Sequence, residues 1–175
     1  MRARQLVIFL LGMWITGSLF MTAVATQNFR NVDRLLAAPP DPAGKMIQEL
    51  GHDSARQLLR YHSSELNRLY FVWWEAAQLV VGITLLITLA RAKCGKVCIV
   101  GAAVMLAITA SMHWLLTPQV VGLGRVIDFL PQGVESPERS QFWKLHGIYS
   151  ALEVAKIALL LIISGLLFFR KEIRT

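Results

Sequence analysis

Four long apolar segments limit what this chain can fold into more than any other feature of its sequence. They cover residues 6–25, 69–90, 97–116 and 147–169, and each is about 20 residues long. A helix of that length, rising ~1.5 Å per residue, crosses the ~30 Å hydrocarbon core of a bilayer. Backbone groups find no water there, so each segment must bond to itself as a helix. We therefore predict an all-α integral membrane protein, a four-helix bundle that forms a single transmembrane domain over residues 1–175.

Basic residues are distributed unevenly among the connections between these segments. The short connections at 1–5, 91–96 and 170–175 hold eight Lys or Arg residues and one acid. The long connections at 26–68 and 117–145 hold nine basic and eight acidic residues. Because Lys and Arg flanking a span stay on the cytoplasmic side, both termini are predicted to be cytoplasmic and both long connections to be outer loops. We expect an integral protein of a bacterial cytoplasmic membrane.

The formal net charge of +7 is therefore explained by the membrane topology and does not indicate a nucleic-acid partner. A nucleic-acid-binding protein gathers its basic residues on one face, whereas here three separate connections share them, so nucleic acid is excluded as a partner. The expected partner is the lipid bilayer, and other membrane subunits or a second copy of the chain stay open. The first segment also resembles a signal peptide that ends at Ala23-Val24-Ala25, which stays open as an alternative to a retained span.

The helices are expected to extend beyond the outer membrane boundary. The first should continue to about Leu36, where a proline-rich stretch breaks it. The fourth should begin with Ser136 as its cap and Pro137 in its first turn. The third should end before Pro118, with Gly124 in the loop that follows.

Two pairs of short segments look alike and suggest an internal duplication. Residues 29–33 (Phe-Arg-Asn-Val-Asp) resemble residues 124–128 (Gly-Arg-Val-Ile-Asp), and residues 60–62 (Arg-Tyr-His) resemble residues 144–146 (Lys-Leu-His). Each half would be a span, an outer helix, a proline-containing loop and a long returning helix. Two such parallel hairpins would be related by an axis along the membrane normal, as in several carriers. Chance similarity between amphipathic helix starts is the alternative.

Three motifs in the second, third and fourth segments resemble a known family. They are Trp-Glu-Ala-Ala-Gln-Leu at 74–79, Trp-Leu-Leu-Thr-Pro at 114–118 and Phe-Trp-Lys-Leu-His-Gly at 142–147. In these motifs the chain resembles the transmembrane protein 205-like family of small four-pass membrane proteins, which is distantly similar to the copper-resistance D-type membrane proteins. The resemblance implies a four-pass fold in a membrane. It implies no catalytic residue, because the family has no settled mechanism.

Three ionisable side chains lie inside the apolar segments at similar depth. Glu75 is in the second segment, and Glu153 and Lys156 are in the fourth. An ionisable group in hydrocarbon costs several kcal/mol unless it faces a partner or a wet cavity. Gln78 lies one helical turn from Glu75, so we predict that these four residues meet in the bundle interior. They form either an ion-pair network that sets helix register or a path for a proton or an ion.

Three histidines fall near the outer ends of the spans. His62, His113 and His146 belong to the second, third and fourth helices, and Glu65 lies one turn from His62. Histidines from facing helices ligate b-type haem, and two histidines with a carboxylate suit zinc or copper. We predict that they line an outward-facing vestibule, closed below by the charged residues. Hydrogen-bonded histidines at the membrane boundary are the alternative.

Three classes of function agree with these features. The first is the handling or permeation of a small cargo, such as a metal ion or haem, through the vestibule. The second is a structural or accessory subunit of a larger membrane complex, and the third is a b-type haem redox protein. The sequence has no recognisable nucleophile–base pair or phosphate-binding loop, so we expect no enzymatic activity. No resident cofactor is expected either, although haem b or a metal ion stays open for the histidines.

Overall fold

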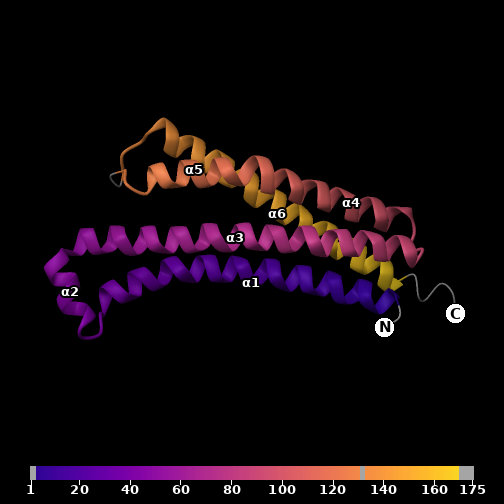
Figure 1. The fold of residues 1–175 in the computed structure, drawn as a ribbon, viewed down its shortest axis with the longest axis horizontal. Coiled ribbons are helices and arrows are strands. Elements are labelled where there is room, and N and C mark those ends of the chain that lie inside the picture. The colour runs from indigo at the N-terminus through magenta and orange to yellow at the C-terminus, as the bar shows by residue number, and fades with distance from the viewer. Residues whose placement is uncertain (1–2, 131–132, 170–175) are drawn as a thin grey trace.

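The computed structural model describes residues 3–130 and 133–169, and these form helices joined by short connections. Their order is α1 (Ala3–Ala37), α2 (Ala43–Leu50), α3 (His52–Arg91), α4 (Lys96–Ser111), the π-helical stretch η1 (Met112–Leu116), α5 (Thr117–Ile127) and α6 (Pro137–Phe169). α4, η1 and α5 follow one another without a break, so the bundle has four long helical stretches. Figure 1 shows that they run alternately in opposite directions, with the start of α1 and the end of α6 at one end.

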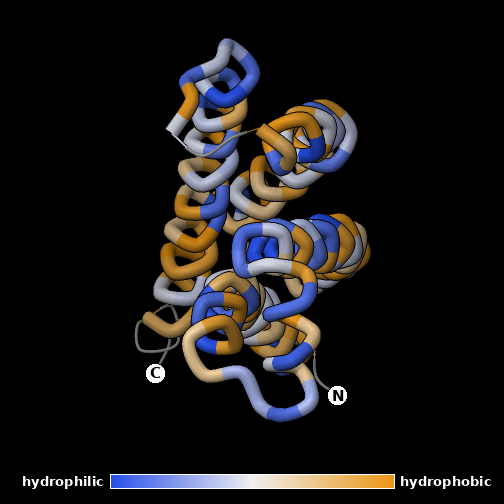
Figure 2. The backbone as a smooth tube through the Cα atoms, turned by 90° about the vertical axis from the view of Figure 1, so that its left-hand side faces the viewer, coloured by the Kyte–Doolittle hydropathy of each residue, from blue (hydrophilic) through white to orange (hydrophobic). Residues whose placement is uncertain are grey.

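All four stretches are long and apolar enough to cross a membrane. Seen from the α2 end, hydrophobic positions run along the long helices, and hydrophilic positions are frequent in the connections nearest the viewer (Figure 2). The prediction of an all-α membrane bundle is confirmed. The basic residues of segments 1–2 and 170–175, used above to predict topology, lie outside the described residues.

The two connections predicted to be outer loops also contain helix. α1 ends within one residue of the predicted position, and α2 occupies part of the first connection. α6 begins at Pro137, and Ser136 Oγ accepts a hydrogen bond from the Arg139 backbone N–H at 3.2 Å, which confirms the predicted cap. The loop expected after Pro118 is wrong, because α5 continues to Ile127.

The third helical stretch passes Pro118 because η1 changes the backbone pattern just before it. The Thr117 N–H donates to the Met112 carbonyl, five residues back instead of four. A proline inside an α-helix lacks an N–H and clashes with the carbonyl four residues earlier. The π turn ends one α-helical run and places Pro118 in the first turn of the next, where a missing N–H is tolerated.

The apolar core lies between α1, α3, α4 and α6 in the half of the bundle that holds the start of α1. Its fully buried side chains include Trp14, Leu85, Met105 and Leu160. Glycines let α1 and α3 approach closely there. A Cβ on Gly17 would lie 2.0 Å from the Trp74 ring, and one on Gly82 would lie 3.2 Å from the Trp14 ring. The tight α1–α3 contact therefore depends on two positions that cannot carry a larger side chain without movement.

The chain also forms two hairpins of the same orientation. In Figure 1, α1 returns through α3, and the stretch from α4 to α5 returns through α6. The two similar segments at 29–33 and 124–128 both lie near the end of the first helical stretch of their hairpin. This arrangement agrees with the two parallel hairpins expected from the sequence, and the duplication itself stays a prediction.

Candidate functional site

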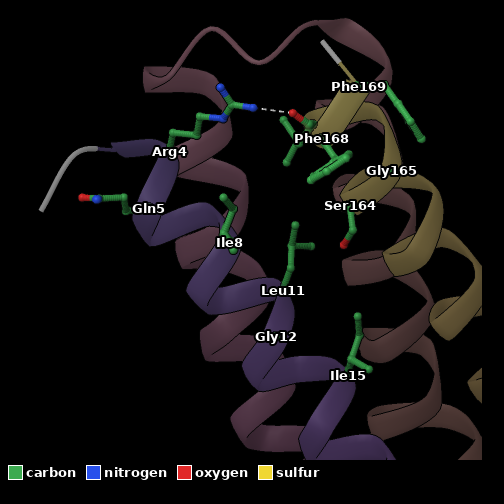
Figure 3. Close-up of a pocket in the computed structure, with 11 residues that line it drawn as sticks. Arg4, Gln5, Ile8, Leu11, Gly12, Ile15, Ser164, Gly165, Phe168 and Phe169 are labelled. Atoms are coloured by element: carbon green, nitrogen blue, oxygen red, sulfur yellow. Dashed lines mark hydrogen bonds between the residues drawn. The ribbon is translucent and has the colours of Figure 1, made fainter. Parts of the chain in front are cut away.

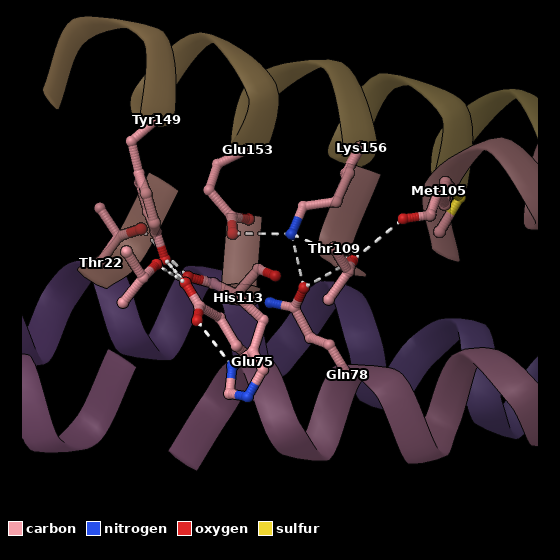
Figure 4. Close-up of polar contacts among 11 residues, drawn as sticks. Thr22, Glu75, Gln78, Met105, Thr109, His113, Tyr149, Glu153 and Lys156 are labelled. Carbon is pink, nitrogen blue, oxygen red and sulfur yellow. Dashed lines mark hydrogen bonds and ion pairs between the residues drawn. The ribbon is translucent and has the colours of Figure 1, made fainter. Parts of the chain in front are cut away.

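Polar side chains from three helical stretches meet in the bundle interior beside the apolar core (Figure 4). Glu75 and Gln78 come from α3, and Glu153 and Lys156 come from α6. Glu75, Gln78 and Lys156 have no exposed surface, and the Glu153 side chain is 20% exposed. All four lie within segments predicted to span the membrane. We call them, with their hydrogen-bond partners described below, the polar cluster.

Lys156 is the centre of one half of the polar cluster. Its Nζ donates to Gln78 Oε1 at 2.5 Å and to Glu153 Oε1 at 2.8 Å. A third, longer contact reaches Thr109 Oγ1 at 3.4 Å. An ammonium group has three N–H donors, and all three find an oxygen here. The structure thus brings Gln78, Glu153 and Lys156 into one hydrogen-bonded group.

Glu75 is the centre of the other half. Its Oε1 accepts hydrogen bonds from Thr117 Oγ1 at 2.5 Å and from the Tyr149 hydroxyl at 2.9 Å. Its Oε2 lies 3.1 Å from Nδ1 of His113, which donates when that nitrogen carries the proton. Three polar partners thus satisfy a carboxylate that has no access to water.

The two halves lie side by side because each helix supplies residues on consecutive turns. Glu75 and Gln78 are three residues apart on α3, and Tyr149, Glu153 and Lys156 follow one stripe of α6 (Figure 4). The sequence reasoning missed Tyr149, although its spacing of four and seven residues from the two charged positions of α6 places it on their face. That spacing is a signal that could have identified it.

The π turn places the remaining partners. Thr109, His113 and Thr117 are four residues apart, and in a regular α-helix each step of four drifts by about 40° around the axis. The η1 turn contains one extra residue, which reverses this drift by a similar angle. The side chains of Thr109, His113 and Thr117 therefore all point at the polar cluster. Hydropathy gives no sign of a π turn, which explains why the two threonines were not predicted.

The polar cluster contains more carboxyl groups than amines. It contains two carboxyl groups, Glu75 and Glu153, and one amine, Lys156. With these groups ionised and His113 neutral, the sum is one negative charge. The side chains of His113 and Glu153, which are 23% and 20% exposed, reach the edge of the cluster, and each can take up a proton.

Unpaired polar atoms border the polar cluster at the α1–α3 contact. Among the described residues, buried side-chain atoms without a hydrogen-bond partner are Trp14 Nε1, Ser18 Oγ, Trp74 Nε1 and Gln78 Nε2. Trp14 packs against Gly82 and Trp74 against Gly17, which sets the corresponding turns of α1 and α3 opposite each other. Unpaired donors are costly in hydrocarbon. They offer hydrogen bonds to water or to a small polar solute beside the cluster.

The three histidines predicted to share a site have separate surroundings. His113 contacts Glu75, whereas His62 is exposed on α3. His146 is exposed on α6 and stacks on Phe142 at 5.6 Å between ring centroids. In residues 3–130 and 133–169, no group of three or more His, Cys, Asp or Glu side chains is placed to hold a metal ion. A haem or metal site at these histidines stays a prediction.

Glu65 belongs to a second ionic network, in the part of α3 that precedes the predicted span. Arg125 donates to both of its oxygens at 2.9 Å, and Arg68 donates to Oε1 at 2.7 Å. Arg68 also donates to Asp128 Oδ2 at 2.7 Å. Hydrogen bonds from Arg125 and Arg68 hold the pKa of Glu65 at about 2, below its usual range. A Cβ on Gly124 would lie 2.7 Å from the Arg68 guanidinium, so the absence of a side chain lets α5 approach α3.

Two grooves open on the surface of the described bundle, and neither is lined by a histidine. The larger, of about 980 Å³, lies between α1 and α6 beside Arg4 (Figure 3). The smaller, of about 590 Å³, runs along α1 next to Trp74. Both lie in the half of the bundle that holds the start of α1, away from the predicted outward-facing vestibule.

Comparisons with protein-family models, with curated proteins and with solved structures find no match to this chain. The resemblance to the transmembrane protein 205-like family therefore rests on its three motifs, and the function has to be inferred from the geometry of the polar cluster.

Proposed function

We propose that this protein handles a small cargo in the membrane and that the polar cluster binds a proton as part of that task. The observation that carries this proposal is that the polar cluster contains two carboxyl groups, Glu75 and Glu153, and one amine, Lys156. When all three groups are ionised, one negative charge is left without a partner, and an uncompensated charge in hydrocarbon costs several kcal/mol. One proton, taken up by His113 or Glu75, makes the cluster neutral. A small monovalent cation bound between the carboxylates would have the same effect.

The hydrogen bonds of the cluster support proton uptake from its edge. His113 is partly exposed and lies 3.1 Å from Glu75, so a proton that reaches the imidazole has an acceptor within hydrogen-bond distance. Tyr149 bonds to the same carboxyl group and can both donate and accept. Histidine, carboxylate and tyrosine thus form a short chain of groups that exchange protons.

The tight packing of the cluster favours a proton or another small cargo over haem. Lys156 and Glu75 already contact protein oxygens or nitrogens at 2.5–3.1 Å, so protein partners occupy the polar atoms that a large ligand would need. The unpaired Gln78 Nε2 and the indole N–H of Trp74 nearby provide donors for a solute of about the size of water.

Location and family membership are part of the same proposal. The basic residues of the α3–α4 turn, among them Arg91 and Lys93, support placing the end of the bundle that holds the start of α1 in the cytoplasm of a bacterial cell. The three motifs support membership of the transmembrane protein 205-like family. Both proposals agree with a four-pass bundle.

Proton flux into liposomes tests the proposal. The purified protein is reconstituted with a pH-sensitive dye trapped inside, and a potassium diffusion potential drives protons inward. We expect faster acidification than in empty liposomes, and we expect Glu75→Gln to abolish the difference. Glu49→Gln, on the exposed face of α2, is the matched control and should behave as the original chain.

Two measurements separate loss of function from loss of structure. Circular dichroism and gel-filtration elution report whether Glu75→Gln remains folded, and His113→Gln removes the proton acceptor while keeping a polar side chain next to the carboxylate. Acidification by either folded variant at the rate of the original chain, or by the original chain at the rate of empty liposomes, contradicts the proposal.

A further inference from the structure

The larger groove is apolar and open to the side of the bundle. Ile8, Leu11 and Phe168 are among the residues that line it, between the first turns of α1 and the last turns of α6 (Figure 3). Gly12 and Gly165 line it too, and a Cβ added at either would meet no heavy atom within 4 Å. The groove is therefore a space that side chains of the described residues leave unfilled.

A cation lies at one end of this groove. Arg4 stands in the first turns of α1, and its guanidinium donates a hydrogen bond to the Leu167 carbonyl near the end of α6 (Figure 3). That bond holds the guanidinium at the end of the groove and uses one of its five N–H donors. The ion pairs found within residues 3–130 and 133–169 do not include Arg4.

The length of the groove indicates what can occupy it. On α1 the lining runs from Arg4 to Ile15, which is about 16 Å at ~1.5 Å per residue. That length is about half of the ~30 Å hydrocarbon core, so the groove spans one leaflet. A helix of a second copy of this chain would need a groove that crosses both leaflets. A lipid of one leaflet has the matching shape, with apolar chains of that reach and a headgroup at the boundary.

We propose that the α1–α6 groove binds an anionic phospholipid, with an acyl chain along Ile8 and Leu11 and the phosphate on Arg4. A guanidinium binds phosphate through a charge-assisted hydrogen bond, which a neutral apolar solute cannot form. Basic residues of the α3–α4 turn, such as Lys93, lie at the same end of the bundle and attract anionic headgroups to it (Figure 1).

Lipid titration followed by native mass spectrometry tests this site. The purified protein in detergent is titrated with phosphatidylglycerol, which is anionic, or with phosphatidylcholine, which is zwitterionic. We expect one tightly bound phosphatidylglycerol. Arg4→Gln should weaken its binding about tenfold, the effect of one charge-assisted hydrogen bond, and should weaken phosphatidylcholine less, because the choline ammonium offsets the phosphate charge. Gly165→Leu should fill the groove and weaken the binding of both lipids.

Two matched controls accompany these variants. Lys45→Gln removes an exposed positive charge on α2, at the opposite end of the bundle, and Gly147→Leu adds the same side chain to α6 at another open position. Both should bind phosphatidylglycerol as the original chain does. Because a Cβ at Gly165 meets no atom, Gly165→Leu should keep the melting temperature of the lipid-free protein.

The outcomes that overturn the proposal are distinct. If Arg4→Gln binds phosphatidylglycerol with the affinity of the original chain, the contact between the lipid phosphate and Arg4 is excluded. Original affinity in Gly165→Leu would place the lipid elsewhere. A dimer of the original chain that Gly165→Leu converts into monomers would show that a second copy, and not a lipid, occupies the groove.

Discussion

Replacing Lys156 by methionine is expected to destabilise the bundle more than replacing Lys156 and Glu153 together. The single change removes the ammonium group on which Glu153 and the Gln78 carbonyl depend, at 2.8 and 2.5 Å, and leaves a largely buried carboxylate unpaired. Breaking one partner out of a buried ion pair costs about 3–5 kcal/mol, and the 20% exposure of Glu153 places the expected loss near the lower end, about 3 kcal/mol. For a chain of this size that corresponds to a fall of roughly 6–12 °C in melting temperature.

The double variant Lys156→Met with Glu153→Gln removes both charges and should recover part of that loss. About 1–2 kcal/mol should remain, because the Gln78 carbonyl keeps no ammonium partner. Far-ultraviolet circular dichroism in detergent, recorded during heating, measures all three variants. Lys144→Met, at an exposed position of the same helix, is the control and should change stability by less than about 0.5 kcal/mol. Strict additivity of Lys156→Met and Glu153→Gln would refute the inferred coupling.

Three further predictions concern other parts of the molecule. Gly17→Ala should lower the melting temperature by several degrees, because its Cβ would lie 2.0 Å from a tryptophan ring, whereas Gly12→Ala, with no atom within 4 Å, should not. Arginine partners hold the pKa of Glu65 at about 2, below its unfolded pKa of about 4.3. The stability that ionised Glu65 contributes is therefore complete above about 4.3 and is lost as the pH falls toward 2. Thermal scans over that window should show a smaller fall in melting temperature for Glu65→Gln than for the original chain. With Cys94 and Cys98 replaced, a single cysteine at Lys45 should react with a membrane-impermeant reagent in intact cells, and one at Lys93 should react only after the membrane is opened. Labelling of position 93 and protection of position 45 in intact cells would contradict the predicted topology.

The number of spans and most helix ends could be predicted from the sequence, because they depend on local properties. A run of about 20 apolar residues needs a helix wherever its neighbours lie. Ser136 and Pro137 start α6 through bonds within a single turn, and that too can be recognised locally. Intramembrane charges such as Glu75 were visible for the same reason, since a charge inside an apolar run stands out without any knowledge of the fold.

The partners of Glu75 were decided by the tertiary structure alone. Thr117 reaches Glu75 because a π turn alters the helix phase, and that turn depends on backbone bonds that hydropathy does not encode. Glu65 had been assigned to a site with histidines, yet α5 brings Arg125, sixty residues away in sequence, against it. Sequence periodicity identifies which face of a helix is polar. Which residue of another helix meets that face depends on helix rotation and separation, which packing at contacts such as Gly17 against Trp74 sets.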